Sequence, residues 1–220
     1  MLDISPTSPS NTFRRRRVGL LTKLIEPIVA RTGQCNILDV GGTRGFWDVW
    51  GKLIEWDHVS ITCLNLPGDG VPVRPSDSPV GMIYGDARDM SGIPDQSYDL
   101  CFSNSVIEHV GGWGDMERMA AEIRRIAPSY MVQTPNYWFP IEPHARTALL
   151  HWLPEPWAYR MVMRRQRGFW AKQDTVAGAV RAIQSARLLD ALQMQALFPD
   201  GRLHRERFMG FTKSLISLKF

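Results

Sequence analysis

The sequence predicts an α/β protein in which a seven-stranded, mostly parallel sheet lies between two layers of helices. Short apolar runs alternate with longer segments of helical period through most of the chain, and this alternation is typical of parallel strands joined by right-handed crossovers. The last two apolar runs, 203–208 and 215–220, have no helix between them. Because a short connection allows only antiparallel pairing, we expect an antiparallel C-terminal hairpin.

Length and composition indicate a single globular domain. The chain has 220 residues, of which 44% are hydrophobic and 22% charged, and both fractions are ordinary for a globular protein. We expect residues 1–11, rich in Ser, Pro and Asn, to be a mobile tail, and residues 12–220 to form the domain. No apolar run approaches the roughly 20 residues of a membrane span, and Pro27 breaks the apolar stretch after the N-terminal arginines. We therefore expect a cytoplasmic protein without a signal peptide.

The cysteines and the charge point to no special partner. Cys35, Cys63 and Cys101 are widely separated, and none lies in a CxxC or Cys/His ligand spacing, so we predict buried thiols in a reducing compartment and no metal site. The net charge of +4 is mild, and no nucleic-acid module is recognisable, so we expect no nucleic acid partner. The arginines at 14–17 are expected to be solvated.

The first half of the chain supplies three strands. A helix from Thr12, with Thr12 as its cap, places Val18, Leu21 and Leu24 at helical spacing. Residues 67–79 are dense in Pro, Gly, Asp and Ser and predict a loop. The remaining expected elements are strands at 36–40, 59–66 and 82–84 and a helix at 46–56.

The second half contains an insert of different character. We expect strands at 98–102 and 130–133, with a helix at 115–126 between them, and a long helix at 174–198 before the terminal hairpin. Residues 136–173 hold four tryptophans, together with Arg160, Arg164, Arg165 and Arg167, which suggests a lid or a binding surface. The stretch 151–170 fits three interpretations: a lid over an acceptor, an amphipathic surface that touches anionic lipid or a phosphorylated carrier, or a helix pair with solvated arginines.

A glycine turn follows the first strand. Residues 37–45 place Asp39 at the strand end, and glycines then allow backbone to approach a ligand before a helix begins. Such a turn can also be purely structural, and its glycines do not fit the G-x-G-x-x-G spacing of dinucleotide sites. The carboxyl edge of the sheet, where the strand order reverses, is the expected ligand crevice.

Residues 39–45 resemble the D/E-x-G-x-G-x-G first motif of class I methyltransferases, with Thr43 in place of the middle glycine. Further matches follow in order at the next strand ends, namely Leu64-Asn65-Leu66, Gly85-Asp86-Ala87 and the run 98–109. The resemblance covers roughly residues 20–220 and is closest to the branch containing ubiquinone-biosynthesis-like enzymes. It implies the class I methyltransferase fold, a Rossmann-like sandwich, and S-adenosyl-L-methionine as cofactor.

The resemblance also implies which residues bind the cofactor. Gly41 and Gly45 would lie against its methionine part, Asp39 would help to hold the amino group, and Asp86 would accept from the adenine amine. Asn65 stands where the family usually has an acid for the ribose hydroxyls, but an amide oxygen can still accept a hydrogen bond. The expected cofactor-binding residues are Asp39, Gly41, Gly42, Thr43, Gly45, Asn65, Leu66, Asp86, Ala87 and Asn104.

Two histidines are candidates for the general base. Methyl transfer needs the nucleophile, the methyl carbon and the sulfur to be aligned, and an alcohol must also lose its proton. His109 follows the fourth strand, and His144 lies with Glu142 in the proline- and aromatic-rich segment after the fifth. Each histidine could instead be structural, and His144 is the favoured base.

The predicted activity is therefore S-adenosylmethionine-dependent O-methylation of a small-molecule, sugar or lipid-linked acceptor. Nitrogen and carbon remain open as acceptor atoms. Two other classes of protein are compatible with the same sheet: a non-catalytic regulator that binds the cofactor, and a nucleotide-dependent oxidoreductase. The segment 151–170 adds a peripheral membrane contact as a further expectation.

Overall fold

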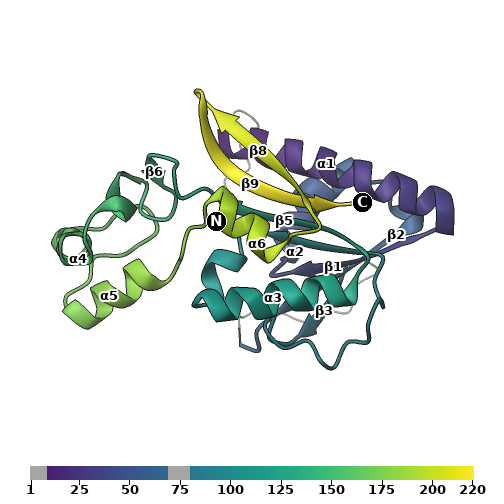
Figure 1. Ribbon diagram of the computed structural model, residues 1–220, viewed down its shortest axis with the longest axis horizontal. Coiled ribbons are helices and arrows are strands. Elements are labelled where there is room, and N and C mark those ends of the chain that lie inside the picture. Colours follow the sequence, from purple (N-terminus) through teal and green to yellow (C-terminus); the bar gives the residue numbers. More distant parts are fainter. Residues whose placement is uncertain (1–8, 69–79) are drawn as a thin grey trace.

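The computed structural model describes residues 9–68 and 80–220 and contains one seven-stranded sheet in the order β3-β2-β1-β4-β5-β9-β8 (Figure 1). Strands β1 to β5 are parallel, β9 is antiparallel to β5, and β8 is antiparallel to β9. This topology confirms the predicted α/β fold. The strands are β1 Cys35–Val40, β2 Val59–Asn65, β3 Val80–Tyr84, β4 Leu100–Asn104, β5 Ser129–Pro135, β8 Arg202–Phe208 and β9 Phe211–Lys219.

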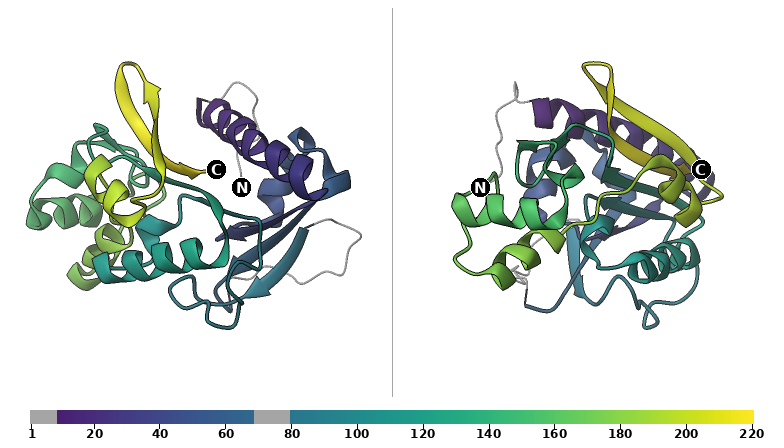
Figure 2. Two further views of the ribbon diagram at one scale, coloured as in Figure 1. Left: turned by 45° about the vertical axis from the view of Figure 1, so that its right-hand side comes forward. Right: turned by 60° about the vertical axis from the view of Figure 1, so that its left-hand side comes forward.

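Helices cover both faces of the sheet, as Figure 2 shows. Alternate residues of a strand face opposite sides, so Ile37 of β1 joins a core with α1 and α2, whereas the next residue, Leu38, joins a core with α3 and α6. The main helices are α1 Pro9–Thr32, α2 Arg44–Trp50, α3 Trp113–Ile126 and α6 Ala191–Leu197. The central strands are therefore buried on both faces, which explains their nearly continuous apolar runs.

The N-terminal helix begins three residues earlier than predicted, at Pro9 rather than Thr12. Proline is compatible with the first turn of a helix because its missing N–H has no partner there in any case. Part of the predicted tail is therefore helical, and residues 1–8 lie outside the described part of the chain. The same holds for residues 69–79 of the predicted loop 67–79.

The helix predicted at 46–56 is wrong in length. α2 ends at Trp50, and two short 3-10 turns, Gly51–Leu53 and Trp56–His58, lead into β2. The ring of Trp56 lies against Gly51, where an added Cβ would overlap it. The chain turns at this glycine so that Trp56 can pack beside Trp47 on the core.

The helix predicted at 174–198 is also wrong, because the structure has two helices there. α5 spans Val176–Gln184, and α6 starts again at Ala191. Asp190 caps α6 by accepting from the Gln193 N–H, and the Asp190 N–H in turn donates to the Gln193 side-chain oxygen. This reciprocal pair is a capping box, and it marks a helix start inside the apolar periodicity.

The insert forms a lobe at one end of the sheet (Figure 1). It contains the two-stranded sheet β6 Ile141–Glu142 and β7 Thr147–Ala148, a 3-10 turn Leu150–Trp152, and helix α4 Glu155–Arg164. α5 packs against α4, and a small core of Ala145, Leu150 and Ala158 holds the lobe together. The lobe therefore includes α5 and extends beyond the predicted limit of residue 173.

Candidate active site

The carboxyl ends of the five parallel strands bring the predicted site residues to one edge of the sheet. β1 ends before Gly41, β2 ends at Asn65, β3 before Asp86 and β4 at Asn104. The segment after β5 carries Glu142 and His144. The strand order reverses between β1 and β4, and in open α/β sheets ligands bind in the crevice at that point.

The glycine turn is packed against two neighbouring side chains. Gly41 has a φ of +77°, which favours glycine, and a Cβ there would overlap Val106 from the segment after β4. A Cβ at Gly42 would overlap the carboxylate of Asp39. Thr43 caps α2, since its Oγ1 accepts from the Phe46 N–H at 3.2 Å. Glycines 41 and 42 are thus explained by packing within the turn.

Asp39 lies beneath this turn and is buried. Its Oδ2 accepts a hydrogen bond of 2.7 Å from the Trp47 indole N–H. Burial raises the pKa of Asp39 to about 7, and the Trp47 hydrogen bond opposes this shift. The carboxylate therefore packs against the glycine turn and links it to Trp47 of α2. The resemblance to the family had implied a contact with the cofactor amino group instead.

Asn65 ties the end of β2 to the glycine turn. Its Nδ2 donates to the Gly42 carbonyl at 2.7 Å. An ionised carboxylate at this position could not donate this bond, which gives a physical reason for an amide here. The Asn65 Oδ1 accepts no hydrogen bond within the described part of the chain, so it is available to a ribose hydroxyl. Leu66, the next residue, is half exposed.

Asp86 begins the segment after β3 and is paired with Arg88. Both carboxylate oxygens accept from the Arg88 guanidinium at 2.6–3.0 Å, and these bonds lower the pKa of Asp86. The carboxylate is partly exposed and stays ionised, so its remaining lone pairs can accept from an amine. Ala87 packs at the edge of the core.

Asn104 has a partner that the sequence did not reveal. Its Oδ1 accepts from Arg17 at 2.9 Å. Arg17 was expected to be solvated, but it is buried and also donates to Glu206 and Gln133. The Asn104 amide oxygen thus points toward α1, which weakens its assignment as a cofactor ligand. The one sequence signal of this burial is that Arg17 precedes Val18, which belongs to the apolar face of α1.

His109 and His144, which are 35 residues apart in the chain, meet at the sheet edge. Their Nε2 atoms lie 3.1 Å apart, and the rings are close to perpendicular with centroids 4.8 Å apart. The Nδ1 of His144 is 2.8 Å from Glu142 Oε1, and the Nδ1 of His109 is 2.8 Å from the Ser185 carbonyl oxygen. The structure therefore brings the three predicted catalytic residues together in one cluster of side chains in contact.

Glu108 completes this cluster and was not among the predicted site residues. It is buried, and its Oε2 accepts from the Thr134 hydroxyl at 3.0 Å. Its Oε1 is also buried and has no hydrogen-bond partner within the described residues. Burial raises the pKa of Glu108. The sequence gives no signal that Glu108 is buried, because it lies in a short turn after β4, beyond the apolar run of that strand.

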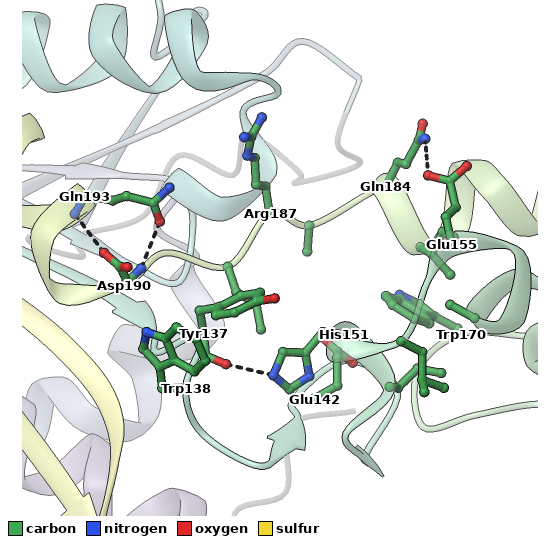
Figure 3. A pocket seen from close by; sticks show the side chains of 16 residues that line it. Tyr137, Trp138, Glu142, His151, Glu155, Trp170, Gln184, Arg187, Asp190 and Gln193 are labelled. Carbon is green, nitrogen blue, oxygen red and sulfur yellow. Dashed lines mark hydrogen bonds between the residues drawn. The ribbon is translucent and has the colours of Figure 1, made fainter.

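Figure 3 shows a cavity of about 400 Å³ that has Glu142 in its lining. It is lined by residues of the lobe and of the segment 186–193 that follows it, and Tyr137, Trp138 and Trp170 contribute aromatic rings. Its volume suits a small organic ligand. The Tyr137 carbonyl accepts from His151 and Trp152, which holds the aromatic wall in place. Glu142 thus connects the cavity to His144.

Comparison with known families identifies the domain. Residues 59–129, which run from β2 into β5, match the family described as "Methyltransferase domain". This segment includes Asn65, Asp86, Asn104 and His109, and it lies within a sheet of the topology expected for the class I enzymes. The family match and the sheet topology together support a class I S-adenosylmethionine-dependent methyltransferase. No curated protein matches it.

Solved structures share the fold of this methyltransferase at low sequence identity. A SAM-dependent methyltransferase from Methanosarcina mazei matches with a TM-score of 0.51 and 12% identity, over 87% of this chain and 95% of the other. A Rhodobacter sphaeroides protein named for Zn-dependent alcohol dehydrogenases matches with a TM-score of 0.53 and 11% identity, over 84% and 83% of the two chains. An Anabaena variabilis protein named for a methyltransferase of antibiotic biosynthesis matches with a TM-score of 0.50 and 18% identity, over 88% of this chain and 64% of the other.

The residues of the methyltransferase fit its cofactor, S-adenosylmethionine. Asn65 would offer an amide oxygen to a ribose hydroxyl, Asp86 an ionised acceptor to the adenine amine, and Leu66 an exposed apolar surface to the ring. These groups follow adjacent strands of the same sheet edge. None of the helices in the described ranges is long and apolar enough to cross a membrane.

Proposed function

We propose that this methyltransferase methylates an oxygen atom of a small-molecule acceptor, free or linked to a sugar or lipid, bound in the cavity beside the lobe. The observation that carries the proposal is the chain of side chains that starts at Glu142, which lines that cavity, and continues to His144 and His109. An alcohol is a poor nucleophile until its proton leaves, and a positioned histidine can remove it. Acceptors that are already nucleophilic would not need such a group.

Glu142 fixes the orientation of His144. One carboxylate oxygen lies 2.8 Å from Nδ1, and the other accepts from the Ala145 backbone N–H. The Glu142 side chain is 3% exposed and that of His144 is 18% exposed, so the imidazole reaches solvent while its partner does not. Because the carboxylate can only accept when ionised, Nδ1 carries the hydrogen and Nε2 presents its lone pair.

Bound S-adenosylmethionine would supply the methyl group, carried on a sulfonium that is a good leaving group, to the acceptor oxygen. The chain itself has to align the acceptor, exclude water and accept the hydroxyl proton. The aromatic residues Tyr137, Trp138 and Trp170 line the cavity and exclude water. His144 is the residue that we propose to act on the proton.

The lobe surface supports acceptors that reside at membranes. Trp157 and Phe169 are 65% and 70% exposed, and arginines 160, 164 and 165 lie on or beside α4. Exposed aromatic rings with neighbouring cations suit contact with anionic lipid. Lipid-linked acceptors are therefore included among the candidates.

The test is transfer of a labelled methyl group. Purified protein is incubated with labelled S-adenosylmethionine and with the soluble and the membrane fractions of a lysate that lacks the enzyme, and the labelled product is identified. We expect a product whose label is in a methyl ether or ester. A label on nitrogen or carbon, or no labelled product from either fraction, would contradict the proposal.

A substitution tests the role of His144. His144→Ala is expected to lower kcat by about 10²-fold or more, the usual contribution of a general base, with little change in affinity for S-adenosylmethionine. His204→Ala is the matched control, because His204 is exposed on β8. Wild-type turnover in His144→Ala would remove this residue from the chemistry.

A further inference from the structure

The histidine cluster has an unbalanced arrangement of lone pairs. The Ser185 carbonyl can only accept a hydrogen bond, so the Nδ1 of His109 must be the donor to it. The same reasoning applies to the Nδ1 of His144 beside Glu142. With both Nδ1 atoms protonated, the neutral rings direct two lone pairs at each other across 3.1 Å. A positive centre between the two nitrogens, either a shared proton or a metal ion, would relieve this repulsion.

A buried carboxylate faces the same space. Glu108, His109 and His144 each offer one ligand atom, and these atoms all lie within 4.8 Å of one another. Glu108 Oε1 is buried without a partner within the described residues, and an unpaired buried carboxylate oxygen is costly. A cation bound by all three groups would supply the missing partner for Glu108 and satisfy both histidine lone pairs.

We propose that Glu108, His109 and His144 bind one divalent transition-metal ion. Two nitrogens bound tetrahedrally to Zn²⁺ at about 2.0–2.1 Å are separated by roughly 3.3 Å, close to the observed 3.1 Å. Two imidazoles and one carboxylate suit Zn²⁺, Co²⁺ or Mn²⁺ better than Mg²⁺, which prefers oxygen ligands. The ligands therefore favour Zn²⁺, and we expect Mg²⁺ to compete poorly.

Groups around the two histidines hold the ring nitrogens that face away from the proposed ion. Metal-bound histidines usually donate their other N–H to a carboxylate or a backbone carbonyl, and Glu142 and the Ser185 carbonyl take these places. Thr134 positions Glu108 through a hydrogen bond of 3.0 Å. Glu108 and His109 follow β4, His144 lies in the lobe after β5, and Ser185 follows α5. The proposed site therefore joins the lobe to the edge of the sheet.

The site is open on one side, since His109 is exposed and His144 is partly exposed. Three protein ligands with an open position are typical of catalytic rather than structural zinc sites. This role rests on the proposed function: the ion would hold the acceptor oxygen and lower the pKa of its hydroxyl, whose proton then leaves to water. With the ion bound, the Nε2 lone pair of His144 serves as a ligand, so the ion replaces His144 as the group that activates the hydroxyl, and the loss of turnover expected for His144→Ala then reflects loss of the ion. Binding of the ion does not depend on methyl transfer.

Metal binding is tested on the full chain without a histidine tag. The protein is stripped with a chelator, dialysed and titrated with Zn²⁺ or Co²⁺, and bound metal is measured by elemental analysis. We expect one equivalent of Zn²⁺, and visible absorption bands from Co²⁺ in a site with nitrogen ligands. Binding of less than a tenth of an equivalent, or of several equivalents with equal affinity, would overturn the proposal.

Variants locate the ion. The double variant His109→Ala/His144→Ala is expected to lose more than 100-fold in affinity for Zn²⁺ and the Co²⁺ bands, and Glu142→Gln to lose about 10- to 100-fold, the usual effect of removing a second-shell partner. Glu108→Gln preserves side-chain shape and should also weaken binding. His204→Ala is the control and should bind as the wild type does, and far-ultraviolet circular dichroism confirms folding of each variant.

Unchanged affinity in the folded double variant would overturn the site. Failure of the proposed function is distinguishable, since a protein that binds one Zn²⁺ at these residues but methylates no oxygen acceptor refutes only the O-methylation. Conversely, methyl transfer by a protein that binds no metal refutes only the metal site.

Discussion

At the scale of single residues, Asp39 illustrates how a motif residue can act indirectly. The sequence placed it at the end of the first strand, next to the glycine turn, and this position is confirmed. Its buried carboxylate packs against Gly42 and accepts from Trp47. The sequence could not show this, because the motif fixes a position along the chain but not the direction of the side chain.

Asp39 predicts a pH dependence of stability. Its pKa is about 7 in the folded protein against 3.8 ordinarily, so the unfolded state ionises first as the pH rises. The free energy of unfolding should therefore fall by about 1.4 kcal/mol per pH unit between pH 4 and pH 7 from this group alone. Above pH 7 the group is ionised in both states and its contribution stops changing.

The check is chemical denaturation of the wild type and of Asp39→Asn at several pH values. Asparagine keeps an oxygen to accept from Trp47 but cannot ionise. The wild type should lose stability relative to Asp39→Asn as the pH rises from 5 to 7. Parallel stability profiles would show that Asp39 does not titrate in this range.

At the scale of elements, the sequence located most strands because apolar runs and strand ends coincide. β1, β2 and β5 match their predicted ranges to within two residues at each end. It failed where tertiary contacts interrupt the periodicity, as at Gly51 beside Trp56 and at the Asp190 cap. The cofactor residues lie on elements that sequence can predict. The cluster of Glu108, His109 and His144 joins segments whose meeting depends on the lobe.

Docking of α1 on the sheet depends on a buried ion pair. Arg17 Nε lies 2.9 Å from Glu206 Oε1 on β8, and both side chains are less than 10% exposed. Arg17→Met should cost about 3–5 kcal/mol in the free energy of unfolding, because it leaves Glu206 buried without its partner. Denaturant unfolding measures this change.

Two companion variants separate the ion pair from other effects of the substitution. Arg15→Met removes an exposed arginine of the same helix and should change stability by no more than about 0.5 kcal/mol. Arg17→Met combined with Glu206→Leu should recover part of the loss, because no buried charge is left unpaired. Equal losses in Arg17→Met and Arg15→Met would refute the importance of the pair.

At the scale of the whole molecule, the proposed cofactor and acceptor sites share one edge of the sheet but differ in how they are built. The donor side consists of strand ends common to a widespread fold, and the same fold occurs in a protein named for alcohol dehydrogenases. The acceptor side is made by the lobe, whose cavity is lined by residues from 137 to 193. Ligand preference therefore has to be tested on the intact chain.

Thermal unfolding distinguishes the donor from a nicotinamide cofactor. A ligand present at 100 times its Kd stabilises the folded state by about 2.7 kcal/mol, and for a chain of this size each 1 kcal/mol raises Tm by about 2–4 °C. S-Adenosylmethionine or its demethylated product should therefore raise Tm by about 5–10 °C, whereas NAD⁺ should not. Asp86→Ala should need more ligand for the same shift, because it removes the acceptor for the adenine amine, while Asp89→Ala should behave as the wild type. A larger rise in Tm with NAD⁺ than with S-adenosylmethionine would contradict the proposed donor site, whatever the lobe binds.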